Sequence, residues 1–301
     1  MSEAWVWLTL AAAGFQTLRF MLQKRLREAA LSTAGATFAR FLYSAPLVAV
    51  IAASYASLSG IGAPDLSPRF WSFALLGGTS QILATMCVVA LFTHRNFAVG
   101  ITFKKTEVLL SALFGAVLLG EGISGPALGA ILIGFLGVLL LSDPPGGEGP
   151  WHRRVLNRAT GLGIAAGILF GISGNGYRGA SLALGEADLF YRAIVTLACV
   201  TAFQLVSMSL WLVWRERGEI TRTLRAWRVA GLVGLTSMAG SICWFTAYAA
   251  QQVALVNALG QVELIFSLAV GAFVFGEKVT AREWQGLLLL TASITALVLL
   301  V

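Results

Sequence analysis

The feature that most constrains this chain is a succession of long apolar segments separated by short polar breaks. An α-helix needs about 20 apolar residues to cross the hydrocarbon core of a bilayer. Charged residues make up only 12% of the chain and hydrophobic residues 57%, whereas a soluble domain is roughly 25% charged. We therefore predict an all-α membrane protein with ten transmembrane helices, at 5–23, 33–57, 70–93, 97–119, 124–142, 159–183, 189–214, 229–250, 253–275 and 280–301.

Tryptophan placement agrees with these boundaries. Tryptophan is enriched where helices meet the membrane–water interface, and most tryptophans of this chain fall at or beside the ends of the predicted helices. The exception is Trp244, which lies in the middle of the predicted helix 229–250.

The basic residues of the loops predict the orientation. If the chain has ten helices, nearly all basic loop residues lie on one side of the membrane, and the other side carries only Arg69 and Arg178. The positive-inside rule places the basic side in the cytoplasm. Both termini are then expected outside the cytoplasm, in a multi-pass protein of the cell (inner) membrane. The basic side carries Lys24, Arg25, Arg27, Arg95, Arg153, Arg154, Arg158, Arg215, Arg217, Arg222, Arg225, Arg228, Lys278 and Arg282.

The chain also repeats itself. Sliding it by 156 residues superimposes Glu107 on Glu263 without a gap, and the pair Gly120-Glu121 on Gly276-Glu277. We predict two five-helix repeats, at 1–142 and 159–301, joined by a loop at 143–158. Because each repeat has an odd number of helices, the second enters the membrane upside down, the inverted-repeat arrangement of many secondary transporters.

Two segments carry a family resemblance. Phe114-Gly-Ala-Val-Leu-Leu-Gly-Glu121 and Val270-Gly-Ala-Phe-Val-Phe-Gly-Glu277 resemble the helix end that marks the EamA-like ten-helix exporters of the drug/metabolite transporter superfamily. An arginine early in the second and seventh helices fits the same family. The chain departs from it where Lys105-Thr106-Glu107 and Gln261-Val262-Glu263 replace a frequent proline, so the sequence itself does not predict a kink there.

Eight ionisable residues fall within the predicted helices, where each costs roughly 2.5–3.5 kcal/mol at the helix centre. Arg40 and Arg192 lie a few residues into their helices, which favours an interfacial or structural role over contact with cargo. Arg19 and Arg178 lie near helix ends, where their long side chains could snorkel to the interface. The remaining four are Lys104, Lys105, Glu107 and Glu263.

Lys104, Lys105 and Glu107 lie deep in the fourth helix, which the resemblance places along a central cavity. One interpretation is that Glu107 and Glu263 pair with Lys105 or an arginine and hold the two repeats together. The other is a cationic patch for a carboxylate or phosphate, with a glutamate that takes up a proton. The sequence leaves both open.

Aromatic and amide side chains form a second set of substrate-binding candidates. An indole in the middle of a membrane helix requires a polar partner or a wet cavity, although core packing is the commoner role. Aromatic rings beside amides would suit a cargo that is part ring and part polar, such as an aromatic amino acid. The set comprises Trp244, Tyr248, Asn257 and Gln261, with Gln16, Asn175 and Tyr177 as counterparts in the first helix of each repeat.

An enzyme is not expected, because the chain has no HExxH, GxSxG or P-loop motif. No cofactor, metal or nucleic-acid partner is expected either; the partners are a small-molecule substrate and the lipid bilayer, with possible proton coupling through Glu107 and Glu263. The sequence thus predicts a secondary transporter of an amino acid or related organic acid, working in the direction of export. The alternatives are an exporter of hydrophobic drugs and a non-transport membrane protein such as a lipid scramblase.

Overall fold

The computed structural model describes residues 4–28, 31–62, 64–91, 104–141, 158–266 and 281–300. Several predictions lie outside these residues. They are the connecting loop except Arg158, the start of the helix 97–119, the end of the helix 253–275, the basic residues Arg95, Arg153, Arg154 and Lys278, and the Gly276-Glu277 pair. Within the described residues every regular element is a helix.

The predicted helix positions agree with the helices found. In the first half these are α1 (Ala4–Glu28), α2 (Thr33–Leu58), α3 (Pro68–Leu91), α5 (Glu107–Phe114), the π-helix η1 (Gly115–Leu119) and α6 (Gly125–Leu141). In the second half they are α8 (Arg158–Ala183), α9 (Leu189–Arg215), α10 (Glu219–Arg225), α11 (Trp227–Ala250), α12 (Val253–Gly260) and α14 (Ala281–Leu300).

Helix α10 was not predicted, since it is too short and too polar to resemble a membrane span. It is held by Glu219, whose carboxylate accepts a hydrogen bond from the backbone N–H of Ser32 just before α2. Glu219 is only 3% exposed. A contact between residues so far apart in the chain leaves no local signal in the sequence.

Five described helices are long and apolar enough to cross a membrane: α2, α3, α8, α9 and α11. Shorter apolar helices are described at Glu107–Leu119, Gly125–Leu140, Val253–Phe266 and Trp284–Leu300. Large apolar side chains are exposed on the outside of the protein, among them Leu58 at 89% and Val117 at 71%. Such a surface matches lipid rather than water, because soluble proteins avoid large exposed apolar patches.

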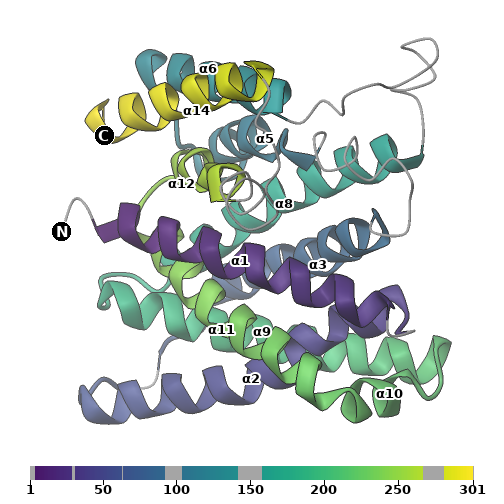
Figure 1. Cartoon of the computed structure of the whole chain (residues 1–301). Helices are drawn as coiled ribbons and strands as arrows, with labels where there is room; N and C mark the ends of the chain where they lie inside the picture. The colour runs from purple at the N-terminus through teal and green to yellow at the C-terminus, as the bar shows by residue number, and fades with distance from the viewer. Residues whose placement is uncertain are drawn as a thin grey trace.

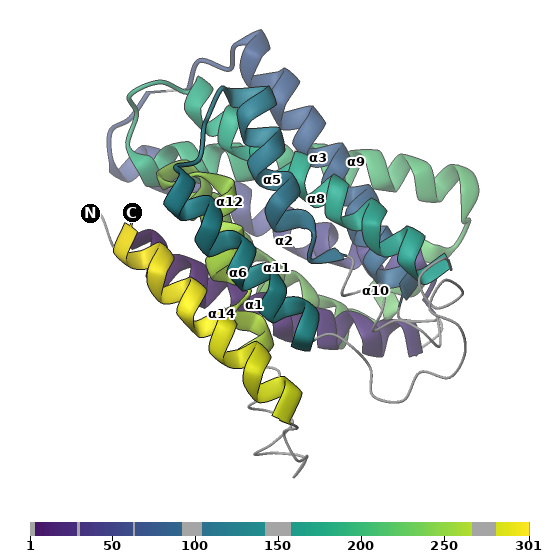
Figure 2. The same ribbon diagram turned by 90° about the horizontal axis from the view of Figure 1, so that it is seen from above.

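The helices pair mainly between the two halves of the chain (Figure 1). Helix α3 packs along α8, α1 along α11, and α2 along α9. Helices α6 and α14 lie side by side at one edge of the molecule, as both views show (Figure 2). Helices α5 and α12 contact each other between that edge pair and the rest of the bundle.

Two apolar helices are interrupted at corresponding points. A turn at Lys105 and Thr106 precedes α5, and a turn at Gln261 follows α12. Lys105 and Gln261 are 156 residues apart, the spacing of the internal repeat. The interruption before α5 packs closely on α8, because a Cβ at Gly167 would lie 3.1 Å from the carbonyl oxygen of Lys104. These breaks form without proline, so the sequence alone gave no reason to expect them.

Candidate functional site: a polar cavity between the halves

A cavity of about 50 Å³ lies where helices from both halves meet. One water molecule needs roughly 10–15 Å³ on this measure, so the cavity holds only a few waters in this conformation. Its walls come from α1, α2, α3, α8 and α11, from Lys104 and Glu107 on either side of the turn before α5, and from α12 with Gln261 and Glu263 after it. Nine of the eleven predicted site residues line it: Gln16, Lys104, Glu107, Tyr177, Trp244, Tyr248, Asn257, Gln261 and Glu263.

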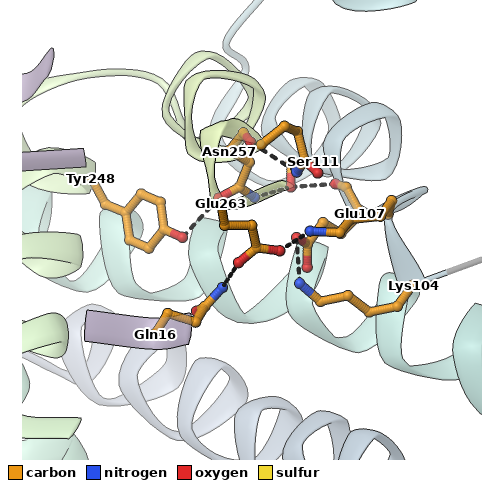
Figure 3. A network of polar contacts seen from close by, with 9 residues as sticks. Gln16, Lys104, Glu107, Ser111, Tyr248, Asn257 and Glu263 are labelled. Atoms are coloured by element: carbon orange, nitrogen blue, oxygen red, sulfur yellow. Dashed lines mark hydrogen bonds and ion pairs between the residues drawn. The ribbon is translucent and has the colours of Figure 1, made fainter. Parts of the chain in front are cut away.

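Both carboxylates of the cavity are paired with lysines. Lys104 Nζ lies 2.7 Å from Glu107 Oε1, within the turn that begins α5. Lys105 forms an ion pair with Glu263, which connects the two halves of the chain. Glu263 also accepts a hydrogen bond of 2.9 Å from Gln16 Nε2 on α1 (Figure 3). The charges of the two lysines are therefore balanced within the protein.

A chain of hydrogen bonds connects α11, α12 and α5 above these ion pairs (Figure 3). Tyr248 donates its hydroxyl to Asn257 Oδ1 at 2.8 Å. Asn257 donates from Nδ2 to Ser111 Oγ at 2.8 Å, and Ser111 donates to the carbonyl oxygen of Glu107 at 2.6 Å. The first two bonds each join two helices and the third lies within α5, so the network connects α12 to both α11 and α5. Ser111 was not among the predicted site residues.

Aromatic rings form part of the cavity wall. Trp244 stacks on Tyr248 with 5.6 Å between ring centroids. The Nε1 atom of Trp244 is buried and has no hydrogen-bond partner among the described residues. Tyr177 stacks on Phe245 with 4.2 Å between centroids. The cavity therefore offers flat apolar surfaces together with an unused N–H donor, a combination suited to a cargo with a planar or apolar part.

Two predicted site residues lie outside the cavity. Asn175 is fully buried and donates from Nδ2 to the carbonyl oxygens of Ser111 at 3.0 Å and Gly171 at 2.9 Å, so it ties α8 to α5. Lys105 lies on the far side of the turn, against α6, α12 and α14, and reaches Glu263 from there. Both residues support the site rather than line it.

The sequence interpretation missed two arginines. Arg19 and Arg40 are 4% and 6% exposed and line the cavity. The expectation that Arg19 snorkels to the interface is wrong, because α1 turns this residue inward to the cavity. For Arg40 we expected an interfacial or structural role, and the interfacial part is wrong, because α2 packs on α9 and α11 and carries Arg40 into the interior. Its hydrogen bonds to Thr85 and Ser241 are compatible with the structural part. Their depth depends on helix tilt and packing, which position along a segment does not reveal.

Arg178 and Arg192 have structural partners. The Nε of Arg178 donates to both carboxylate oxygens of Glu121, at 2.8 and 2.9 Å. Its Nη1 donates to the carbonyl oxygens of Tyr248 at 2.7 Å and Gln251 at 2.9 Å. The expectation that Arg178 snorkels is therefore wrong, since an internal carboxylate holds it. Arg192 donates to the Gly185 carbonyl in the turn before α9, outside the cavity.

The structure explains why a glycine and a glutamate, Gly120 and Glu121, follow the end of η1. Gly120 ends η1 with φ of 69°, a left-handed conformation that side chains with a Cβ rarely adopt. The turn then places Glu121 against Arg178 of the second half. Gly120 thus ends the helix, and the turn that it forms brings Glu121 into contact with the second half of the chain.

Comparison with known proteins adds the family. Residues 158–299 match the EamA-like transporter family. The match is consistent with a member of the drug/metabolite transporter superfamily, and it agrees with the apolar helices of a multi-pass membrane protein.

A comparison with solved structures covers nearly the whole chain. A solved structure described as "Crystal structure of protein" is 14% identical and superposes with a TM-score of 0.65, covering 96% of this chain and 99% of its own. At that identity the likeness concerns the fold alone. No curated protein matches the sequence.

Proposed function

We propose that this protein is a secondary active transporter that moves a small organic metabolite, an amino acid or related organic acid, by alternating access and in the direction of export. The observation that carries the proposal is the polar cavity between the halves. It is small in this conformation, buries both ionic and aromatic groups, and receives side chains from both halves. A cargo-binding site near the middle of two halves is the arrangement on which alternating access operates.

The pattern of helix contacts supports an inverted repeat. In the repeat register, α1 corresponds to α8 and α3 corresponds to α11. The contact of α1 with α11 and that of α8 with α3 are then the same contact seen from each half. The pairs α2 with α9 and α6 with α14 each join corresponding helices, and α5 and α12 contact each other as parts of the corresponding predicted helices 97–119 and 253–275. We infer ten membrane helices related by a pseudo-twofold axis, with both termini outside the cytoplasm.

The interrupted helices support cargo binding at the same place. Discontinuous membrane helices frequently supply binding sites in transporters, because the freed backbone groups can meet a ligand or an ion. Lys104 and Glu107, on either side of the turn before α5, line the cavity, and so does Gln261 in the turn after α12. Two interruptions in one cavity wall would be unnecessary for a packed structural bundle.

Glu107 and Glu263 are the candidate proton carriers. Each is ion-paired with a lysine in this conformation, so protonation would release the lysine and loosen the contact between helices. Replacing either glutamate with glutamine should abolish the dependence of transport on a pH gradient. A variant whose transport follows the gradient as the unmodified protein does would rule that residue out.

Counterflow in proteoliposomes tests the function. Purified protein would be assayed with labelled amino acids, organic acids and one lipophilic cation, with and without a pH gradient. We expect counterflow of one acid class, reduced at least about tenfold in Trp244→Ala. The change removes an aromatic ring from the cavity, so cargo binding loses the free energy of about one stacking contact or more. Trp227→Ala is the matched control on the same helix, because Trp227 is 61% exposed.

The outcomes separate the alternatives. Counterflow of the lipophilic cation instead of the acids would favour the drug exporter. Absence of counterflow for every solute, with lipid movement between leaflets of the same vesicles, would favour a scramblase and contradict the proposal.

A further inference from the structure

The two arginines of the cavity lack counter-charges. Four cationic side chains lie in or beside the cavity, and both carboxylates there are already paired with Lys104 and Lys105. Within the described part of the chain, neither Arg19 nor Arg40 forms a salt bridge. The cavity therefore contains two positive charges that no carboxylate of the described residues balances.

Their hydrogen bonding is also incomplete. Arg40 reaches Ser241 Oγ at 3.2 Å and Thr85 Oγ1 at a long 3.4 Å, both neutral hydroxyls. Arg19 Nη1 is buried without any hydrogen-bond partner among the described residues. Arginine stays charged in proteins and offers five N–H donors, so Arg19 keeps an unused donor group at Nη1 and Arg40 meets only neutral partners. A buried guanidinium without a partner is costly to keep in a membrane protein.

Other unused groups face the same space. Ser237 Oγ on α11 and Trp244 Nε1 line the cavity, and both lack hydrogen-bond partners in the described structure. Both can donate hydrogen bonds. The set of unused donors from α1 and α11 thus surrounds one pocket, together with Arg40 from α2. An oxyanion is the ligand that accepts from all of them at once, and planar guanidinium groups bind carboxylate or phosphate in a two-pronged geometry.

We propose that Arg19 and Arg40 together bind the anionic group, carboxylate or phosphate, of a small organic cargo in the central cavity. The proposal rests on the transport function proposed above and assigns the recognition of the anion to the arginines instead of to Lys104 and Lys105. The lysines hold the helices together through Glu107 and Glu263. The apolar part of the cargo would then lie against the stacked rings of Trp244 and Tyr248.

The test is a binding measurement on the purified full chain in detergent, followed by its thermal unfolding midpoint. The probes are benzoate, L-phenylalanine, succinate and phenyl phosphate, with benzamide, L-phenylalaninamide and succinamide as partners that lack the carboxylate. We expect at least one anion to raise the thermal unfolding midpoint at a concentration at which the matching amide, which lacks the carboxylate, does not. The carboxylate and phosphate probes distinguish the two anions.

Arg19→Gln and Arg40→Gln should each weaken the binding of that anion at least about tenfold, as loss of one charge-assisted hydrogen bond implies. Arg192→Gln is the matched control, because Arg192 lies outside the cavity and binds a backbone carbonyl. If Arg40→Gln does not fold, Arg40→Lys keeps the charge, loses the planar fork and should show an intermediate loss.

Three results would overturn the proposal: no anion stabilises the protein more than its partner, the arginine variants bind the anion as well as the unmodified chain does, or Arg192→Gln loses binding equally. The transport function is judged separately by counterflow. Transport of a neutral or cationic solute that is unaffected in Arg40→Gln would reject the anion site alone. Intact anion binding without counterflow of any solute would reject transport alone.

Discussion

Lys105, in the turn before α5, forms an ion pair with Glu263, just beyond the turn that follows α12. The Lys105 side chain is 2% exposed and that of Glu263 is 13% exposed. The pair thus joins the two halves where both helices are interrupted. A buried ion pair is costly to break on one side, because the remaining charge stays buried.

Lys105→Met should therefore lower the free energy of unfolding by about 3–5 kcal/mol, because it leaves the Glu263 carboxylate without its cation. The double variant Lys105→Met with Glu263→Met should recover most of this loss, since two apolar side chains of similar size replace the pair. Unfolding midpoints in detergent measure both, with the exposed Arg69→Met as control. Strictly additive effects of the single changes would show that the two residues do not interact energetically.

Gly176→Ala should destabilise the contact between α8 and α3. A Cβ at Gly176 would lie 2.8 Å from Gly77 Cα and 2.9 Å from Gly77 N, backbone atoms that cannot rotate away. We expect a loss of about 1–3 kcal/mol, the usual range for overpacking. Gly161→Ala is the control on the same helix, because nothing lies within 4 Å of its position. Similar unfolding midpoints for the two variants would show that α8 and α3 can separate without cost.

Glu121→Gln should weaken the contact between the turn after η1 and α8, and so expose the end of the protein where Glu121 meets Arg178. The change removes the carboxylate that Arg178 Nε contacts, while the bonds to the Tyr248 and Gln251 carbonyls remain. Maleimide labelling of a cysteine at Ala254, which is 2% exposed, should become faster in a background without the three native cysteines. Glu186→Gln, an exposed change in the turn before α9, should leave the rate unchanged. An unchanged rate in Glu121→Gln would mean that the pair does not control this end.

Asp188 should make stability depend on pH at the start of α9. Its pKa is lowered mainly because the backbone N–H of Tyr191 donates to it, at 3.0 Å, and the Tyr55 hydroxyl adds a bond of 2.9 Å. A lowered folded-state pKa stabilises the protein above the unfolded pKa of about 3.9 and loses this effect as pH falls through the folded value. Asp188→Ala should cost about 1 kcal/mol at pH 7.

Unfolding midpoints of Asp188→Ala and the unmodified chain should converge as the pH is lowered through this range. Asp65→Ala, at an exposed position before α3, is the control. A difference that stays constant from pH 7 to pH 3 would contradict the capping role of the Asp188 carboxylate.

The sequence predicted the positions of the long helices and nine of the residues that line the cavity, because the signals for both are local. A membrane helix must satisfy its backbone within one continuous apolar segment, so length and hydropathy locate it. Interior polar residues such as Gln16, Asn257 and Glu263 stand out against that background, and nine of the eleven selected residues line the cavity. The ten-span count and the inverted repeat stay predictions of that pattern.

The tertiary structure decided what those residues do. Which cation meets which carboxylate depends on how helices distant in the chain tilt and pack. The pair of Lys105 with Glu263 was one of the interpretations that the sequence left open, whereas the pair of Arg178 with Glu121 was not predicted. The same packing turned Arg19 and Arg40 into the cavity. Hydropathy by itself determined that the chain belongs in a bilayer, since apolar helices require lipid; only the packing of the two halves determined where unbalanced charge remains for a ligand.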